Sequence, residues 1–368
     1  MKNCRFRWGS LASSISTRRK SFFLTGRPES ACVSDALFSP CARRGRNAPP
    51  LFAVVLLNGL LSCRHFSIHF ENVRNTLSGK KISKVNLMIY DCFLYYDEEM
   101  LLDIRLNTLA EVVDRFVIVE STHTFTGKPK KLNFDPSRFE KFKDKIIYVV
   151  YSDAPIRKPG TDECDAWANE AATRNAIMRG LETATDEDII LVSDVDEIFR
   201  PQAIKAINPR HLCTLLHMPF YNYQFNLQVF NLDGSPRQCT LARATTFKNL
   251  KHYFGGEPET FRNVKKAMPH RNALARAWFK WRCNVIKEAG WHFSWIMTPE
   301  RISEKMSTIS HTEYDLPHLN NKEHIIRAIT EAKDIWNRER KMIKQELCST
   351  RFPAYLVENA HKYSDFIV

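Results

Sequence analysis

The stretch Asp188-Ile-Ile-Leu-Val-Ser193-Asp194-Val195-Asp196-Glu197 sets a short apolar run directly before a cluster of carboxylates. An uninterrupted apolar run of this length is typical of a strand that is buried on both faces of a parallel sheet. In such sheets ligands lie outside the carboxyl ends of the strands. Asp194 and Asp196 therefore stand where a ligand is expected.

Two carboxylates separated by one residue are able to reach the same hard cation. A Mg²⁺ or Mn²⁺ ion held between them would bridge to a diphosphate and neutralise the charge of a departing nucleoside diphosphate. The motif thus favours the chemistry of a nucleotide-sugar transferase, with Asp194 and Asp196 as metal ligands and catalytic residues and Glu197 as a further catalytic candidate. The alternative is an acidic turn that caps the next helix, where the helix dipole favours Asp196 or Glu197.

Outward from this motif, strands and helices alternate along the chain. Further apolar runs predict strands at residues 85–93, 115–120 and 145–151, and helical spacing predicts helices at residues 97–112, 137–143, 165–181 and 201–207. This order predicts an α/β fold with a mostly parallel central sheet and helices on both faces. The second half is less regular: we expect strands within residues 215–230, 239–247 and 290–295, and one long charged helix over residues 321–347.

Polar residues at the other strand ends are candidates for donor binding. Asp91 belongs to the first predicted strand, and the loop after the second strand carries Glu120, Thr122, Thr124 and Lys128, whose hydroxyl and ammonium groups suit a base, ribose or phosphate. The alternative for this loop is an ordinary solvated turn. On the helix before the Asp194 motif, Arg174 and Asn175 are further donor-binding candidates; the alternative for Arg174 is an ion pair with Glu170 on the same helix face.

A third metal ligand is expected in the aromatic stretch Trp291-His292-Phe293-Ser294-Trp295. Two carboxylates leave a metal short of ligands, and a neutral imidazole suits Mn²⁺. His292 is the candidate, and His311 is a weaker one. A histidine among apolar residues is more often a core residue with its own hydrogen bonds. The neighbouring aromatic rings suit either stacking on a sugar or core packing.

The charge of the chain is concentrated at its N-terminus. The protein has 368 residues with 54 Lys+Arg and 41 Asp+Glu, and residues 1–70 hold 11 of the basic and 2 of the acidic ones. The remainder, with 43 basic and 39 acidic residues, is close to neutral, which argues against a nucleic-acid partner. Residues 84–365 are expected to form the catalytic domain.

Residues 1–50 are rich in Arg and Ser, and we expect a disordered basic tail, a transit peptide or sequence upstream of the true start. Residues 51–70 contain an apolar run of the length of a signal-peptide core, which predicts a signal or a weak anchor. Such a segment would place the protein in the Golgi or secretory pathway. As an anchor it would make the chain a type II membrane protein, with membrane association through residues 51–70. If the start is wrongly assigned, the protein is soluble.

The ten cysteines show no C-x-x-C spacing, which argues against a cysteine-based zinc site. The six that follow residue 70 suit either disulfides in a secretory compartment or small buried thiols. We favour buried thiols for Cys92 and Cys213, which lie inside apolar runs.

Five strings occur in an order that resembles one known family. They are Ile89-Tyr-Asp-Cys-Phe93, Val117-Ile-Val-Glu-Ser-Thr-His-Thr-Phe-Thr-Gly-Lys-Pro-Lys130, Asp165-Ala-Trp167 with Glu170 and Arg174-Asn-Ala-Ile-Met-Arg-Gly-Leu181, Ser193-Asp-Val-Asp-Glu-Ile198 and Gly290-Trp-His-Phe-Ser294. Over residues 85–365 the chain resembles glycosyltransferase family 17. One departure is Phe199, where the family usually has proline.

The resemblance implies a GT-A-like nucleotide-sugar-binding fold, UDP-GlcNAc as donor, a divalent metal, and transfer of N-acetylglucosamine with inversion to a mannose-containing glycan or glycoprotein acceptor of the N-glycan type. By position, Asp194 and Asp196 would carry the metal and the diphosphate. A carboxylate would deprotonate the acceptor hydroxyl. Its identity stays open among five residues: Glu197, Glu257, Glu259, Glu313 and Asp315.

Two other functions compete with this one. A phosphoryl hydrolase would use an aspartate of the Asp-x-Asp motif as nucleophile, but it would carry the motif on the first strand, followed by Thr or Val. A catalytically inactive glycan-binding protein would bind glycans equally well when Asp194 and Asp196 are replaced by alanine.

Overall fold

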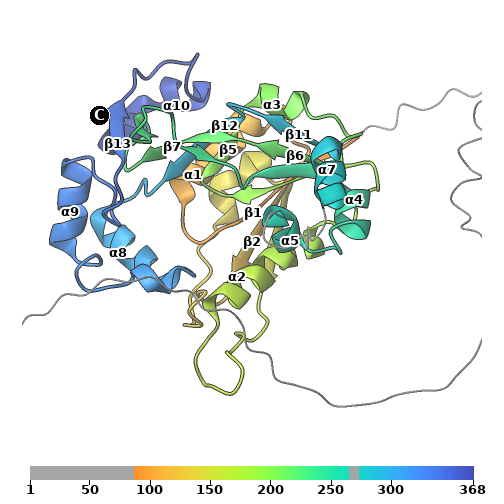
Figure 1. Cartoon of the computed structure of the whole chain (residues 1–368), viewed down its shortest axis with the longest axis horizontal. Helices are drawn as coiled ribbons and strands as arrows, with labels where there is room; N and C mark the ends of the chain where they lie inside the picture. The colour runs from red at the N-terminus through yellow and green to blue at the C-terminus, as the bar shows by residue number, and fades with distance from the viewer. Residues whose placement is uncertain (1–86, 265–272) are drawn as a thin grey trace, which may run out of the picture. The chain divides into compact units, whose positions relative to one another are not determined.

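The computed structural model describes residues 87–264 and 273–368 (Figure 1). These residues belong to one compact unit, Ile82–Val368. The tail and signal or anchor predicted for residues 1–50 and 51–70 lie outside the described residues. Within the described part of the chain, no helix has both the length and the apolar character needed to cross a bilayer.

A seven-stranded sheet forms the centre of the unit. Its strand order is β11 (Cys283–Ile286), β6 (Cys213–Leu216), β10 (Arg243–Thr246), β4 (Ile189–Asp194), β1 (Ile89–Leu94), β2 (Arg115–Ser121) and β3 (Ile146–Tyr151). Strands β4, β1, β2 and β3 are parallel to one another, β11 is parallel to β6, and β10 alone is antiparallel to its neighbours. The predicted α/β fold with a mostly parallel sheet is confirmed.

Both faces of this sheet are buried, which explains the uninterrupted apolar strands. Side chains alternate between the faces along each strand, so Leu191 packs in one core with α1 (Glu99–Leu109), and Val192 packs in a second core with η2 (Ala176–Gly180) and α4 (Phe247–His252). The same alternation directs Ser193 toward α1 and Asp194 toward the opposite face.

A second sheet carries the aromatic segments. Its order is β13 (Lys341–Lys344), β8 (Leu227–Phe230), β7 (Met218–Asn222), β12 (Gly290–Ser294) and β5 (Glu197–Phe199), with β9 (Gln238–Cys239) paired to β7. Trp291 and Phe293 of β12 pack with the C-terminal helices α10 (Ala354–Glu358) and η4 (Ala360–Phe366). Because β5 follows the Asp194 motif directly, this motif joins the two sheets.

The remaining helices surround the sheets. They are η1 (Pro136–Phe142), α2 (Ala166–Asn175), α3 (Pro201–Lys205), α5 (Pro258–Arg262), α7 (Ala273–Arg282), α8 (Pro299–Thr308), η3 (Thr312–Tyr314) and α9 (Lys322–Thr330). Figure 1 shows α8 and α9 at one end of the unit and α4 and α7 at the other. Helix α2 begins after Asp165, whose side chain accepts a hydrogen bond from the backbone N–H of Ala168.

Two predictions for the second half are wrong. The long helix expected over residues 321–347 ends with α9, because the chain turns through left-handed Ala332 and Asn337 and buries Ile335 against α8 and α9. The charged residues of this segment suggested a continuous helix, and their spacing did not show that Ile335 packs in the core beside α8 and α9. The strand expected over residues 239–247 is divided into β9 and β10, which pair in different sheets.

Gly290 allows the close approach of β12 and β5. A Cβ atom there would lie 2.1 Å from the carbonyl oxygen of Ile198. We therefore expect Gly290→Ala to lower the free energy of unfolding by about 3 kcal/mol, because the clash is with backbone that cannot rotate away. Gly234→Ala is the control: its φ of 81° strains alanine, but its surroundings are open, so the expected loss is about 1 kcal/mol. An equal or smaller loss at Gly290, measured by urea unfolding, would contradict this account.

Candidate active site

A cavity of about 790 Å³ opens at the carboxyl end of β4. Its walls come from the loops after β1 and β2, from α2 and α5, from β7 and β12, and from α8. Asp194 and Asp196 both line it, and so do Arg174, Thr124 and His292. Five of the residues predicted from sequence are thus brought together at one place.

Arg105 of α1 holds the strand-end turn from below. Its side chain is fully buried and bonds both carboxylate oxygens of Asp91, at 2.6 and 2.8 Å. It also donates to the Ser193 hydroxyl at 2.6 Å and to the backbone carbonyls of Asp194 at 2.7 Å and Glu197 at 2.9 Å. Asp91 therefore lies inside β1 and does not line the cavity; it positions Arg105 and is not placed to bind a donor.

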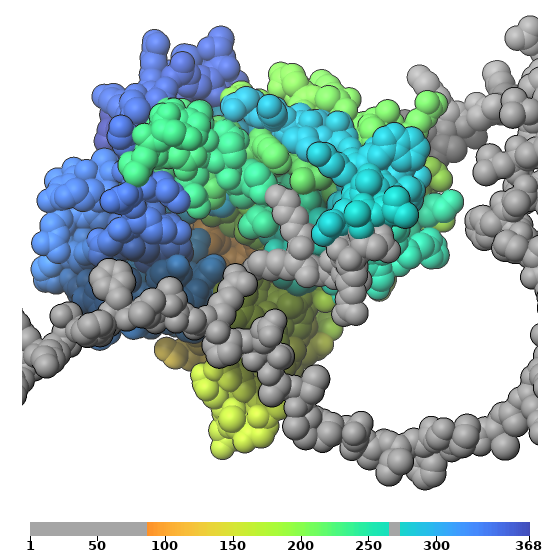
Figure 2. All heavy atoms as spheres, in the orientation of Figure 1, coloured from red at the N-terminus to blue at the C-terminus, as the bar shows by residue number. Residues whose placement is uncertain are grey.

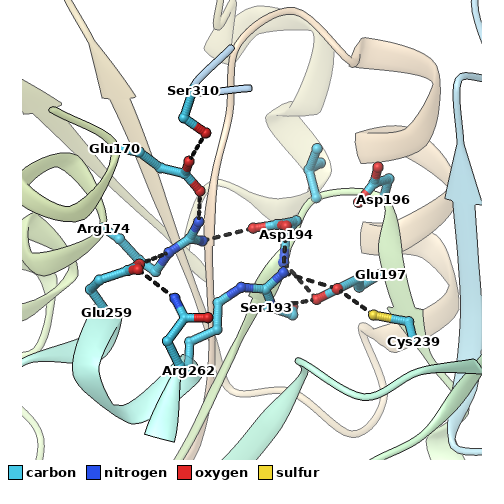
Figure 3. Close-up of polar contacts among 12 residues, drawn as sticks. Glu170, Arg174, Ser193, Asp194, Asp196, Glu197, Cys239, Glu259, Arg262 and Ser310 are labelled. Carbon is cyan, nitrogen blue, oxygen red and sulfur yellow. Dashed lines mark hydrogen bonds and ion pairs between the residues drawn. The ribbon is translucent and has the colours of Figure 1, made fainter. Parts of the chain in front are cut away.

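Two arginines converge on Asp194 from the opposite face of the sheet (Figure 3). Arg174 donates to its Oδ1 at 2.7 Å, and Arg262 of α5 contacts its Oδ2. Arg174 also binds Glu170 of α2 and, at 2.7 Å, Glu259 of α5. Burial raises the pKa of Asp194, but the positive charges of Arg262 and Arg174 outweigh burial and hold the pKa below its ordinary value. Both alternatives considered for Arg174 are therefore realised at once, because it pairs with Glu170 and also lines the cavity.

Glu197 lies beneath the cavity and does not line it. Its carboxylate accepts from Arg262 at 2.7 and 3.0 Å, from the Asp194 backbone N–H at 3.0 Å and from the Cys239 thiol at 3.0 Å. Burial raises the pKa of Glu197, yet Arg262 and His292 hold it well below its ordinary value. The structure thus gives Glu197 the task of holding the turn, out of reach of a substrate.

Asp196 differs from its neighbours because one of its oxygens has no partner. Its Oδ1 is buried without a hydrogen bond, while Oδ2 lies 3.7 Å from His292 Nε2. In Figure 3 the Asp196 side chain stands apart from both arginines. Burial raises the pKa of Asp196, and the charges of His292 and Lys305 offset only part of this effect.

His292 lies between Asp196 and Glu197, with its ring against Phe220. Its Nδ1 is buried without a hydrogen bond. Burial lowers the pKa of His292, but Asp196 and Cys239 outweigh burial and raise it well above its ordinary value. Glu197, Cys239 and His292 bring three possible ligand atoms within 4.8 Å of one another, although Arg262 already occupies Glu197.

The remaining donor-binding candidates are distributed unevenly. Glu120 is fully buried, binds Lys130 and accepts from the backbone N–H groups of Asn133 and Phe134, so it closes its own loop. Thr122, Lys128 and Asn175 do not line the cavity, and Asn175 Oδ1 accepts from the backbone N–H of Glu259. From this segment Thr124 and Lys130 line the cavity, together with Ser121, His123 and Phe125.

Sequence reasoning missed several cations of this site, and we consider three of them: Arg262 on α5, and Arg301 and Lys305 on α8. Arg301 and Lys305 are four residues apart and so share one face of α8. They pair with Asp97 and Glu98 of the loop after β1. Burial lowers the pKa of Lys305, but Glu98 and Asp196 outweigh burial and raise it. The four-residue spacing was the available signal, but none of the three follows a strand.

Among the five carboxylates considered as the catalytic base, Glu259 lines the cavity and the other four do not. Glu257 is exposed on the surface. Glu313 pairs with His311, and Asp315 accepts from Asn320. Glu259 is therefore the member of this set that is placed to meet a substrate.

Four aromatic rings line one part of the cavity, which we call the aromatic wall. Trp295 packs at 5.6 Å against Trp336, and Trp167 of α2 meets His311 edge-on at 4.7 Å between ring centroids. All four rings line the cavity. Trp167 remains 48% exposed, which leaves part of its surface open to a ligand.

The sequence profile of glycosyltransferase family 17 matches residues 65–367. The chain belongs to glycosyltransferase family 17. The match includes every element of both sheets, so the family assignment rests on the folded unit and not on the N-terminal segment.

Curated relatives of this family 17 chain have the name beta-1,4-mannosyl-glycoprotein 4-beta-N-acetylglucosaminyltransferase. The proteins of Rattus norvegicus, Homo sapiens and Mus musculus are each 26% identical to it over an alignment of 231 residues that covers 58% of this chain. These residues cover 41% of the rat and mouse proteins and 42% of the human protein, so the match spans about two fifths of their length.

Among solved structures, the inositol-1-phosphate CTP transferase from T. maritima aligns with 61% of this chain and 97% of its own length. The identity is 15% and the TM-score 0.30.

The buried pair of Arg105 and Asp91 yields a test of how the turn is held. Arg105→Met leaves the Asp91 carboxylate buried without a partner, and we expect it to lower the free energy of unfolding by about 3–5 kcal/mol. Replacing both, as Asp91→Leu with Arg105→Met, removes both charges and restores most of that loss. Urea unfolding measures both variants. A double variant no more stable than the single one would show that the pair is not the cause.

Proposed function

We propose that this chain transfers N-acetylglucosamine from UDP-GlcNAc to a mannose-containing, N-glycan-type acceptor, with inversion at the anomeric carbon. One observation carries the proposal: the unpaired, buried Oδ1 of Asp196 lies in a cavity that also exposes Arg301 and Lys305. A polar atom left without a partner in a native structure calls for a bound group that completes it. Membership of family 17 and the names of the relatives support the sugar and the acceptor.

The cations of α8 suit the diphosphate of the donor. Lys305 and Arg301 line the cavity and pair with Glu98 and Asp97 of one loop, and Arg301 also pairs with Glu304 of its own helix. Positive charges fixed in advance near a leaving group stabilise the negative charge that develops on it. We assign to Lys305 and Arg301 the contact with the leaving UDP. The loop after β2, with Thr124 and Lys130, is proposed to bind the nucleoside part of the donor.

Mn²⁺ or Mg²⁺ fits part of the predicted ligand set. Asp196 Oδ1 is a buried ligand atom without a hydrogen bond, and His292 presents its Nε2 to the same carboxylate, 3.7 Å from Oδ2, while its Nδ1 faces Glu197 at 3.5 Å. Both oxygens of Asp194 are instead taken by arginines. We therefore propose that Asp196 and His292 hold the ion, which supplies charge neutralisation of the diphosphate, and that Asp194 serves to fix Arg174 and Arg262.

Glu259 is the proposed general base. It takes the proton of the acceptor hydroxyl as the hydroxyl oxygen attacks the anomeric carbon of the donor sugar. The bond from that carbon to the diphosphate oxygen breaks, and UDP leaves with its electron pair. A single displacement of this kind inverts the anomeric carbon. Arg174 orients Glu259 through its contact at 2.7 Å with Oε2.

The aromatic wall is the proposed acceptor side. Trp167 and Trp295 offer ring faces on which the apolar face of a sugar is able to stack. Acceptors of this type are assembled in the secretory pathway, so we place the protein there.

Replacing Asp196 tests the donor site. We expect Asp196→Asn to lower kcat/KM for UDP release from UDP-GlcNAc by at least about 100-fold, because the group that meets the diphosphate or its ion loses its charge. Asp233→Asn, at an exposed turn, is the matched control and should leave activity unchanged. EDTA should abolish activity and Mn²⁺ restore it; undiminished activity in EDTA would overturn the metal role. Glycan binding without UDP release from any mannose-terminated acceptor would favour a binding protein.

Replacing Glu259 tests the base. Glu259→Gln keeps the size of the side chain and its contact with Arg174 but cannot accept the proton. We expect kcat to fall by about 10²–10⁴-fold with KM for UDP-GlcNAc within threefold. Glu257→Gln, two residues away and exposed, is the control. A Glu259→Gln variant with more than a tenth of the wild-type kcat would exclude Glu259 as the base.

A further inference from the structure

Helix α7 presents an apolar stripe to solvent at a place remote from the cavity. Leu274, Trp278 and Trp281 stand at i, i+4 and i+7, so they share one face of the helix. Leu274 is 84% exposed, Trp281 76% and Trp278 43%. No residue from α7 lines the cavity. Figure 2 shows α7 standing out on the surface of the unit.

Phe279 attaches α7 to the protein. It packs against the second core and stacks on Tyr253 at 6.4 Å between ring centroids, and Trp278, at the edge of the stripe, contacts the same ring at 5.9 Å. No α7 side chain is buried. The apolar stripe is therefore left outward by the way the helix docks, and it is not part of the core of this unit.

Cations border the apolar stripe on both sides. At 100° per residue, Lys280 lies about 100° from Trp281 on one flank of the stripe, and Arg282 lies about 80° from Leu274 on the other. Arg276 lies on the opposite side of the helix, about 160° from Leu274. None of these three forms an ion pair with a described residue. From Thr260 to Lys287 the sequence contains no aspartate or glutamate. The exposed face of α7 is thus apolar in the middle and basic at the edges, and this stretch of sequence contributes no acidic residue to it.

We propose that α7 lies on an anionic lipid surface, with Leu274 and Trp281 entering the boundary between headgroups and acyl chains. A short amphipathic helix with tryptophan on its apolar face and Lys or Arg beside it is the arrangement that binds in the plane of a membrane interface. Tryptophan prefers the headgroup level, and each nearby Lys or Arg adds attraction to anionic lipids.

Neighbouring residues fit this orientation. Strand β11 follows α7 directly and is the edge strand of the seven-stranded sheet. Its Val285 is 46% exposed, and Lys287 beyond it is exposed too. They add an exposed apolar and an exposed basic residue close after the helix in the sequence. A protein partner fits this surface less well, because charged residues, lysine among them, are depleted at the centres of protein interfaces.

The test uses the full chain and vesicles of phosphatidylcholine, with and without 30% phosphatidylserine (about a physiological anionic fraction). We expect the wild-type protein to co-sediment with the anionic vesicles at least about tenfold more tightly than with the neutral ones, and less tightly as salt rises. Equal binding to both kinds of vesicle would overturn the proposal.

Two variant pairs locate the binding surface. Leu274→Ser with Trp281→Ser removes the apolar stripe, and Lys280→Glu with Arg282→Glu reverses the basic edges; each pair should weaken binding to anionic vesicles by at least about tenfold. The controls are Leu232→Ser, an exposed leucine in a turn, and Lys341→Glu with Lys344→Glu on β13. Both controls should bind within twofold of wild type.

All variants should keep wild-type UDP release, which separates this proposal from the catalytic one. If the α7 variants bind vesicles as the controls do, residues outside α7 cause the binding and the proposal is wrong. Sedimentation velocity without lipid tests whether a second copy of this chain covers the stripe instead. If the wild-type protein self-associates, and the α7 variants abolish this self-association but leave vesicle binding unchanged, the stripe is a contact between copies and the lipid proposal is wrong.

Discussion

The guanidinium group of Arg105 is the interaction on which the site depends. It is fully buried, is neutralised by Asp91 of β1, and bonds the backbone carbonyls of Asp194 and Glu197 where β4 ends. Burying an ion pair carries a large desolvation cost that only good geometry and additional hydrogen bonds offset. Here the additional hydrogen bonds go to the turn that carries the carboxylates. The hydrogen bonds that offset the desolvation cost of Arg105 therefore also fix the backbone at the floor of the cavity.

With the backbone of the turn fixed, the alternation of β4 separates the tasks of neighbouring residues. Ser193 turns toward α1 and meets Arg105, whereas Asp194 turns to the other face and meets Arg174 and Arg262. Asp196 lies past the end of the strand and retains an oxygen without a partner. Two aspartates that look equivalent in the sequence are therefore different groups: one is a counter-ion for arginines, and the other is open to a ligand.

Much of the central sheet follows from local pattern. The strands β1 to β4 have apolar residues on both faces and could be predicted, and so could the helices between them. The second half could not be predicted equally well, because β9 and β10 pair in different sheets and Ile335 leaves the helical pattern to enter a core between α8 and α9. Such choices depend on partners that are distant along the chain, and no local period records them.

The sequence by itself determined the α/β class, the strand-end position of Asp194 and Asp196, and the family to which the chain belongs. These follow from residue types and their order. Tertiary structure alone decided that Asp91, Glu120 and Glu197 hold the frame, that Arg262 and Lys305 reach the site, and that α7 turns its tryptophans outward. The physical reason is that a charged side chain acquires its role from the charges and carbonyl groups that face it after folding. These groups come from distant parts of the chain: Lys305 and Glu98, which form one ion pair, are 207 positions apart.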